Sequence, residues 1–145
     1  MLKILIADDH AIVRRGLKDI LREAAEPATV GEAGTGLEAL EKAQSGAWDV
    51  VVLDITMPDM SGLDVLKRLK KGQPDLPVLM LSMHSSEQYV HSSLKAGASG
   101  YLSKESAPEE LIIALHAILA GKRYLSRSLA ERIKLEDSPK KIGAS

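Results

Sequence analysis

Three carboxylates, a hydroxyl and an ammonium stand at corresponding places in the sequence, each just past a short apolar run. They belong to Asp8, Asp9, Asp54, Ser82 and Lys104. Carboxylates brought together repel one another and resist full ionisation, and a hard divalent cation relieves that repulsion. Mg²⁺ typically binds one or two carboxylates and completes its octahedron with waters and phosphoryl oxygens. With a lysine and a serine to contact further oxygens, the set fits a phosphoryl group attached to, or passing through, a carboxylate.

The apolar runs are expected to be strands, and the segments between them helices. The runs span residues 4–7, 29–32, 50–53, 78–81 and 100–102, and all but the last are rich in Val, Ile and Leu. Several lack polar alternation, which is typical of strands buried on both faces of a parallel sheet. The intervening segments are amphipathic; in the first, Val13, Leu17 and Leu21 share one helical stripe. This alternation with short connections predicts right-handed crossovers and a three-layer, doubly wound α/β fold.

The candidate side chains should meet at one edge of this sheet. Ligands bind outside the carboxyl ends of the strands in open α/β sheets, and every candidate follows the end of an expected strand. Any single Asp after a strand is most simply a helix cap or a turn residue. The joint occurrence of three carboxylates, a hydroxyl and an ammonium favours a functional site.

Residues 1–121 fill this architecture as one domain, and 122–145 are expected to form a short helix and a linker. Gly97 is placed to end the fourth helix, as glycine often does at a C-terminal cap. The segment Ser106-Ala107-Pro108-Glu109 predicts that the fifth helix begins with a capping box. A further short helix is expected to begin near Ser128.

The composition is that of an ordinary globular domain, with 145 residues of which 45% are hydrophobic and 27% charged. Without Phe, the core must be largely aliphatic. The lack of Cys rules out disulfides and thiolate chemistry within these residues and fits the cytoplasm. The net charge of −1 offers no overall attraction for nucleic acid, and no apolar stretch approaches membrane-spanning length. We therefore expect a cytoplasmic protein that does not act at a membrane.

Together with their neighbours, the candidate residues resemble the motif set of response-regulator receiver domains from bacterial two-component systems. The segment Asp54-Ile55-Thr56-Met57-Pro58-Asp59-Met60-Ser61-Gly62 carries much of that resemblance. The segments 96–104 and 121–126 narrow it to the NarL/FixJ (LuxR-type) subfamily. The resemblance runs from residue 1 to about 126. It implies the flavodoxin-like (βα)5 receiver fold, with strand order 2-1-3-4-5.

The resemblance also implies a metal site beside a phosphoacceptor. Asp54 matches the phosphoacceptor, and Asp9 matches a direct ligand of Mg²⁺ or Mn²⁺. Asp8 matches the acidic neighbour that tends to reach the metal through water. Thr56 matches the position whose backbone carbonyl ligates the metal, so that role does not restrict its side chain.

Three further residues match the parts of a phosphorylation switch. Lys104 matches the phosphoryl-binding lysine, Ser82 the switch hydroxyl and Tyr101 the switch aromatic on the neighbouring strand. Phosphorylation is expected to draw Ser82 toward the phosphoryl oxygens, and Tyr101 then rotates into the vacated space. The change would be read on the surface of the fourth helix, the fifth strand and the fifth helix.

The function implied by the resemblance is signalling rather than enzymatic turnover. A cognate sensor histidine kinase would donate a phosphoryl group to Asp54, and the domain would assist its own phosphorylation and dephosphorylation. NarL/FixJ-type receivers precede a helix-turn-helix domain, so DNA binding and transcription regulation would come from a C-terminal domain missing from residues 1–145. The family also suggests homodimerisation on phosphorylation. The alternative is a stand-alone receiver or docking module without DNA-binding output.

Two other functional classes fit the sequence less well. An aspartate-nucleophile phosphatase carries Asp-x-Asp-x-Thr after its first strand, whereas Asp54-Ile55-Thr56 lacks the second Asp and follows the third strand. A nucleotide-binding domain would carry the dinucleotide fingerprint or a P-loop, and the sequence contains neither.

A few residues near the site depart from the family pattern or have no expected role. Glu105 follows Lys104, where many receivers have Pro. Met83 follows Ser82, where many receivers have a smaller residue, and it could narrow access to the phosphoacceptor. His10 and His84 flank the site in sequence but have no second His or Cys at ligand spacing, so we interpret both as surface residues.

Overall fold

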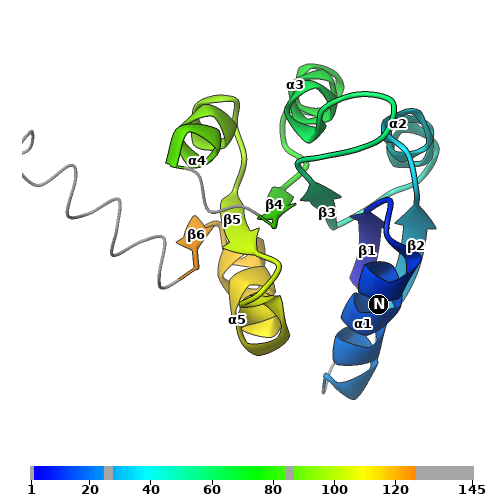
Figure 1. The fold of residues 1–145 in the computed structure, drawn as a ribbon, viewed down its shortest axis with the longest axis vertical. Coiled ribbons are helices and arrows are strands. Elements are labelled where there is room, and N and C mark those ends of the chain that lie inside the picture. The colour runs from blue at the N-terminus through cyan, green and yellow to red at the C-terminus, as the bar shows by residue number, and fades with distance from the viewer. Residues whose placement is uncertain (1, 25–27, 84–86, 127–145) are drawn as a thin grey trace, which may run out of the picture.

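The computed structural model describes residues 2–24, 28–83 and 87–126. A sheet lies between two layers of helices (Figure 1). The strands are β1 (Leu2–Ala7), β2 (Ala28–Ala33), β3 (Val50–Asp54), β4 (Val78–Ser82), β5 (Gly100–Ser103) and β6 (Tyr124–Leu125). The helices are α1 (Ala11–Glu23), α2 (Gly36–Ser45), α3 (Gly62–Gly72), α4 (Glu87–Lys95) and α5 (Ala107–Leu119). In these ranges no helix has the length and apolar character needed to span a bilayer.

All six strands pair in parallel, in the order β2-β1-β3-β4-β5-β6. The predicted doubly wound fold and the order 2-1-3-4-5 are therefore confirmed, and β6 is an addition. Two residues are too few to show a strand pattern in a sequence, so β6 was not predicted. The Ser126 N–H extends the pairing by donating to the Tyr101 carbonyl (3.0 Å). The sheet thus reaches into 122–145, and the predicted helix near Ser128 lies outside the described residues.

Each face of the sheet carries its own apolar core. On β3, Val51 and Leu53 belong to the core shared with α2, α3 and α4. Val50 and Val52 belong to the core shared with α1 and α5, on the opposite face (Figure 1). All residues of β3 and β4 are buried, which accounts for apolar runs without polar alternation. Among the described residues, Tyr101 is the one aromatic side chain in the set of largest fully buried residues.

Glycine ends α4 as predicted. Gly97 has a φ of +105°, in the left-handed region. Its N–H donates to the Leu94 carbonyl (3.1 Å), and the Ala98 N–H donates to the Ser93 carbonyl (2.9 Å). These two bonds form a Schellman motif, which satisfies carbonyls left over at the end of the helix.

The predicted capping box at the start of α5 is wrong. Ser106 is the residue before the helix, but its side chain caps no helical N–H, and its backbone is already in the right-handed helical region. Its hydroxyl instead lies 2.7 Å from the Ser103 hydroxyl. The side chain is thus used to tie the helix to the end of β5.

The strand order brings the predicted site residues to one edge of the sheet. Asp8 follows β1, and Asp54 ends the adjacent strand β3. Ser82 ends β4, and Lys104 directly follows β5, the next strand along. The chain reverses its direction of sheet growth between β1 and β3, which is where ligands bind in doubly wound sheets.

Candidate functional site

Two carboxylates come from the loop between β1 and α1. Asp8 is fully buried, whereas Asp9 is exposed. The Asp8 N–H donates to the Ala33 carbonyl (3.0 Å), and the Asp8 carbonyl accepts a hydrogen bond from the Arg14 guanidinium (2.5 Å). These bonds fix the backbone of the loop against β2 and α1, so the Asp8 carboxylate has a defined position at the sheet edge.

Asp54 is held at the end of β3 with 2% of its surface exposed. The Thr56 N–H donates to its Oδ1 (3.2 Å). The chain then folds back so closely that the Gly62 N–H donates to the Ile55 carbonyl (2.7 Å). A Cβ on Gly62 would collide with the Asp54 carbonyl. Glycine is therefore required at position 62, because the loop after β3 folds back closely against the backbone of Asp54.

Lys104 connects the two buried acids. Its Nζ lies 2.8 Å from Asp8 Oδ2 and 3.1 Å from Asp54 Oδ2. The lysine side chain is only 7% exposed. Its position follows from the end of β5, because the Lys104 N–H donates to the Ser82 carbonyl on β4 (2.8 Å). One ammonium thus faces two buried carboxylates.

The pKa values of Asp54 and Lys104 are both raised from their ordinary values. Burial raises the pKa of Asp54, and the neighbouring Asp8 carboxylate raises it further; the Thr56 N–H and Lys104 offset only part of the rise. For Lys104, burial by itself lowers the pKa, but the hydrogen bonds and charges of Asp8 and Asp54 outweigh burial and raise it. The ammonium is therefore firmly charged, while the Asp54 carboxylate is incompletely neutralised.

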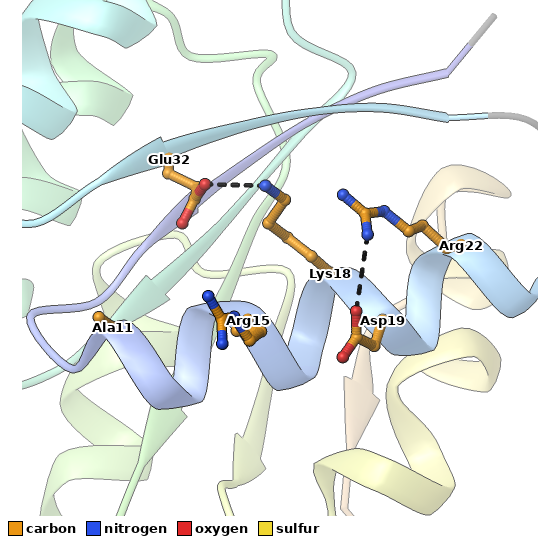
Figure 2. Close-up of a pocket in the computed structure, with 6 residues that line it drawn as sticks. All are labelled: Ala11, Arg15, Lys18, Asp19, Arg22 and Glu32. Carbon is orange, nitrogen blue, oxygen red and sulfur yellow. Dashed lines mark hydrogen bonds and ion pairs between the residues drawn. The ribbon is translucent and has the colours of Figure 1, made fainter.

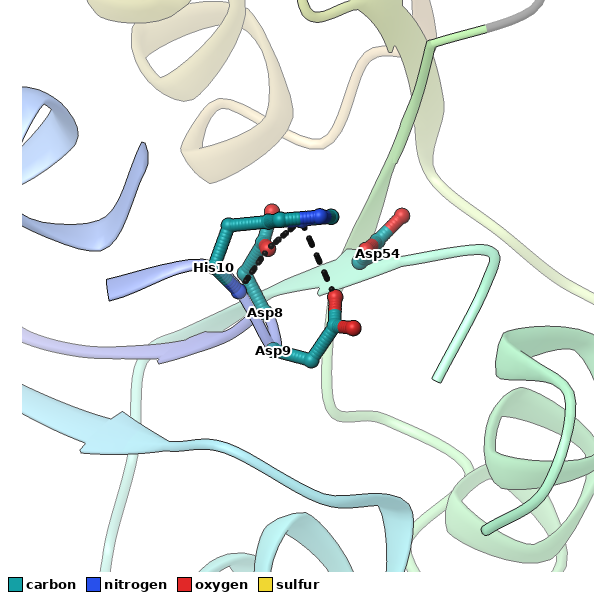
Figure 3. A group of neighbouring side chains, drawn as sticks. All are labelled: Asp8, Asp9, His10 and Asp54. Carbon is teal, nitrogen blue, oxygen red and sulfur yellow. Dashed lines mark hydrogen bonds and ion pairs between the residues drawn. The ribbon is translucent and has the colours of Figure 1, made fainter. Parts of the chain in front are cut away.

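The structure adds His10 to the site. Its Nδ1 lies 3.2 Å from Asp8 Oδ1 and 3.1 Å from Asp9 Oδ1 (Figure 3). Asp8, Asp9, His10 and Asp54 each offer one ligand atom, and these atoms lie within 4.8 Å of one another. The interpretation of His10 as a plain surface residue is incomplete. The available signal in the sequence is its place directly after two acids, since no second His or Cys stands at ligand spacing.

The two predicted switch residues lie behind the acids. Ser82 and Tyr101 are both fully buried. Burial raises the pKa of the Tyr101 phenol, and the nearby Ser82 hydroxyl counteracts part of that rise. Tyr101 therefore already occupies an inner position in this structure, close to the serine.

Comparison with known proteins decides the family. The family described as "response regulator receiver domain" matches residues 4–116. The chain belongs to the receiver domain family. This receiver domain is 34% identical to the response regulator UvrY of Escherichia coli strain K12 over 135 residues, which is 93% of the chain and 62% of UvrY. It is 37% identical to the transcriptional activator protein ExaE of Pseudomonas putida over 142 residues, 98% of the chain and 66% of ExaE.

A solved structure places the receiver domain in the expected subfamily. A two-component response regulator of the LuxR family from Aurantimonas sp. SI85-9A1 superposes with a TM-score of 0.88 and 34% identity, covering 94% of this chain and 97% of the other. The NarL/FixJ (LuxR-type) resemblance is thereby confirmed. The chain spans about 62% of the length of UvrY, so the receiver domain is compared here with only part of that relative.

The departures from the family pattern are visible at the rim of the site. The Lys104–Glu105 peptide is trans, as are the other peptide bonds in the described ranges. Met83 is 71% exposed. Its side chain lines a mostly apolar surface pocket with Leu17, Pro108 and Lys104, between α1 and α5. Met83 thus lies over the lysine side of the receiver site, and its effect on access to Asp54 stays a prediction.

A second hollow on the receiver domain is chemically different. It lies along α1 and is lined by Ala11, Arg15, Lys18, Asp19, Arg22 and Glu32 (Figure 2). Lys18 pairs with Glu32 (2.9 Å), and Arg22 pairs with Asp19 (3.8 Å). Much of the charge in this hollow is therefore neutralised by ion pairs between its own lining residues, whereas the two carboxylates at Asp54 share one ammonium.

Proposed function

We propose that this receiver domain accepts a phosphoryl group on the Asp54 carboxylate from a sensor histidine kinase, beside a bound Mg²⁺ or Mn²⁺ ion. The observation that carries the proposal is the placement of Lys104, whose ammonium contacts both Asp8 and Asp54 at the carboxyl edge of the sheet. Two buried carboxylates that share one ammonium leave a negative charge unmatched, and this charge favours the binding of a divalent ion. The same ammonium is placed to meet a phosphoryl oxygen on Asp54.

The donor set suits a hard cation. Asp9 is the proposed direct carboxylate ligand, Asp8 the acid that reaches the ion through water, and Asp54 a ligand through its carboxylate. The Thr56 backbone carbonyl completes the proposed protein ligands. Carboxylate, carbonyl and water oxygens are the ligands that Mg²⁺ and Mn²⁺ prefer. When bound, the ion would offset negative charge on the transferring phosphoryl group.

Asp54, Lys104 and Ser82 have different proposed roles in phosphoryl transfer. A carboxylate oxygen of Asp54 attacks the phosphorus of a phosphohistidine, a P–O bond forms, and the P–N bond breaks. The electron pair of that bond leaves on the imidazole, which takes up a proton. Lys104 holds a phosphoryl oxygen by charge, and the Ser82 hydroxyl donates a hydrogen bond to another. Transfer of this kind depends mainly on positioning and electrostatic stabilisation.

The proposed readout is a change in packing behind the acid. When Ser82 turns toward the phosphoryl oxygens, it vacates space, and the already buried Tyr101 rotates to fill that space. The fully buried position of Tyr101 supports this role, because the side chain shares a core with residues of α4 and can bias the surface of α4 and β5. Chemical-shift changes confined to the loop after β3 on phosphorylation would refute the switch.

For the whole protein, we propose a signalling rather than an enzymatic role. ExaE is described as a transcriptional activator, and this chain covers 66% of it, so an output domain following the receiver is proposed to bind DNA and regulate transcription. Homodimerisation on phosphorylation is proposed as the coupling step. A stand-alone receiver or docking module is the alternative, and a cytoplasmic location fits both.

The test is intact mass spectrometry after incubation with Mg²⁺ and acetyl phosphate. We expect one added phosphoryl group on the wild type and none on Asp54→Asn or without metal. Thr56→Ala is the matched control, because a backbone carbonyl ligand does not depend on the side chain, so this variant should be modified like the wild type. Absence of modification with acetyl phosphate and with phosphoramidate would favour the docking module instead.

A further inference from the structure

His10 places a nitrogen donor against the proposed metal ligands. Its ring Nδ1 faces Oδ1 of Asp8 and Oδ1 of Asp9, at 3.2 and 3.1 Å. The His10 N–H also donates to Asp8 Oδ1 (2.8 Å), which fixes the backbone of the histidine beside the acid. His10 precedes α1, but its side chain caps no N–H of that helix. The ring is therefore directed to the acids by contacts other than helix capping (Figure 3).

These distances match the spacing of neighbouring ligands around one ion. Metal–ligand bonds of about 2.0–2.2 Å at right angles place adjacent donor atoms about 3 Å apart. The separations from Nδ1 to the two carboxylate oxygens have this value. The four donor atoms of Asp8, Asp9, His10 and Asp54 lie within 4.8 Å of one another. This is slightly more than the distance of about 4.0–4.4 Å across a shell with these bond lengths, so a small inward movement of the side chains would bring them around one ion. An ion at the acids would thus lie within reach of the imidazole.

We infer that His10 is a ligand of the metal in this receiver domain, and that the site binds Mn²⁺ and later first-row divalent ions in preference to Mg²⁺. The inference rests on the proposed metal site. All-oxygen donor sets suit Mg²⁺, whereas an imidazole nitrogen favours transition metals. The His10 side chain is 59% exposed, so the ring can adjust to an arriving ion at little cost in packing.

A different role for His10 would have the opposite consequence. A protonated imidazole between two carboxylates would act as a resident cation, like Lys104. Its removal would then free the acids and tighten binding of every divalent ion. A ligand role instead predicts that removal weakens binding of transition metals selectively. The sign of the change therefore separates the two roles.

The experiment measures Mn²⁺ and Mg²⁺ affinity by calorimetry for the wild type, His10→Gln and His116→Gln. The three proteins are compared in the same buffer at the same pH. His116 is exposed on α5 and serves as the matched control for adventitious binding to surface histidines. Pulsed electron paramagnetic resonance of bound Mn²⁺ reports directly on a ligating nitrogen.

We expect the ratio of Mn²⁺ to Mg²⁺ affinity to fall about tenfold or more in His10→Gln, since losing even an outer-shell partner of a metal ligand costs about 10–100-fold in metal affinity. Nitrogen coupling to Mn²⁺ should be present in the wild type and His116→Gln and absent in His10→Gln. An unchanged ratio without nitrogen coupling, or tighter binding of both ions, would overturn the inference.

Asp9→Asn separates this inference from the proposed function. If Mg²⁺ binds the wild type, weakens in Asp9→Asn and supports phosphorylation, while the nitrogen coupling is missing, only the role of His10 fails. If neither ion binds the wild type, the proposed metal site fails together with the inference.

Discussion

Two groups of charged residues, one at the carboxyl edge of the sheet around Asp54 and one between α1 and β2 around Glu32, differ in which charge is in excess. Around Asp54, a single ammonium from Lys104 serves two buried carboxylates. Around Glu32, the Lys18 ammonium and the Arg14 guanidinium both serve one carboxylate, at 2.9 and 3.1 Å. The first group is buried, whereas the Glu32 side chain is 37% exposed.

The two groups shift carboxyl pKa values in opposite directions. Burial and Asp8 raise the pKa of Asp54. The hydrogen bond from Lys18 lowers the pKa of Glu32; burial opposes it, and Arg14 adds to the lowering, so that the pKa is lowered overall. The Glu32 group is structural, since the chain itself supplies more than enough positive charge for its one carboxylate. The Asp54 group lacks positive charge, and that shortage is what we connect to cation binding and phosphoryl transfer.

The largest expected effect comes from removing the one cation of the Asp54 group. Lys104→Met leaves two buried carboxylates without their partner and should destabilise the metal-free protein by about 3–5 kcal/mol. Added Mg²⁺ should recover more stability in this variant than in the wild type. Urea unfolding with and without Mg²⁺ measures both effects.

Lys18→Met is the matched control for that experiment. It removes an ion pair at the surface, where such pairs contribute about 0–1 kcal/mol. Equal losses for the Lys104 and Lys18 variants would show that the two groups do not differ as described.

A second change relieves the repulsion without removing the cation. Asp54→Asn replaces a buried acid of raised pKa by a neutral side chain, and Lys104 keeps Asp8 as its partner. We expect the metal-free protein to become more stable, because the raised pKa of Asp54 means that its ionised form is unfavourable in the folded state. Mg²⁺ should then raise the melting temperature less than it does for the wild type. A variant less stable than the wild type, with an unchanged response to Mg²⁺, would contradict the charge shortage.

The pH dependence of stability should have opposite signs in the two groups. Asp54 has a raised folded pKa, so its unfavourable contribution at neutral pH is relieved as pH falls through that value. Glu32 has a lowered folded pKa, so its favourable contribution is present above the unfolded pKa of about 4.3 and is lost as pH falls through the folded value.

Unfolding free energies of Asp54→Asn, Glu32→Gln and the wild type across the acid range test these signs. The advantage of Asp54→Asn should shrink on acidification, and the disadvantage of Glu32→Gln should shrink at lower pH. Differences from the wild type that stay constant with pH would rule out both assignments.

The smallest expected effect is the response of the Glu32 pair to salt. A double-mutant cycle of Lys18→Met and Glu32→Gln should give a coupling of about 0.5 kcal/mol at low ionic strength. The coupling should decline in about 1 M salt, where the screening length is about 3 Å. A coupling that resists salt would indicate that this group is better shielded from solvent than its exposure implies.

Much of the site could be predicted because the ends of the strands can be located from the sequence. Parallel strands buried on both faces appear as apolar runs, so the residue that follows each run is known to lie at one edge. Asp8, Asp54, Ser82 and Lys104 were placed together on this basis, and the structure brings them together. The pairing of Lys104 with two acids, rather than one, depends on distances that spacing does not reveal.

What was missed depends on short-range geometry. β6 consists of two residues, and its pairing with β5 comes from backbone bonds that any side chains could form. Ser106 had the sequence of a cap, but a nearby hydroxyl on Ser103 competed for its side chain. His10 lies beside the acids because its backbone N–H donates to Asp8 Oδ1, with the ring Nδ1 close to Asp8 and Asp9. Such local competition leaves no periodic signal.

The central claim is that Asp54 carries the phosphoryl group. Top-down fragmentation of the intact protein after incubation with Mg²⁺ and acetyl phosphate, under conditions that preserve acyl phosphates, locates the modification directly. We predict a single phosphoryl group on Asp54, formed only with the metal and formed equally in Glu32→Gln. A phosphoryl group on Asp8, Asp9 or a histidine, with Asp54 unmodified, would contradict the claim.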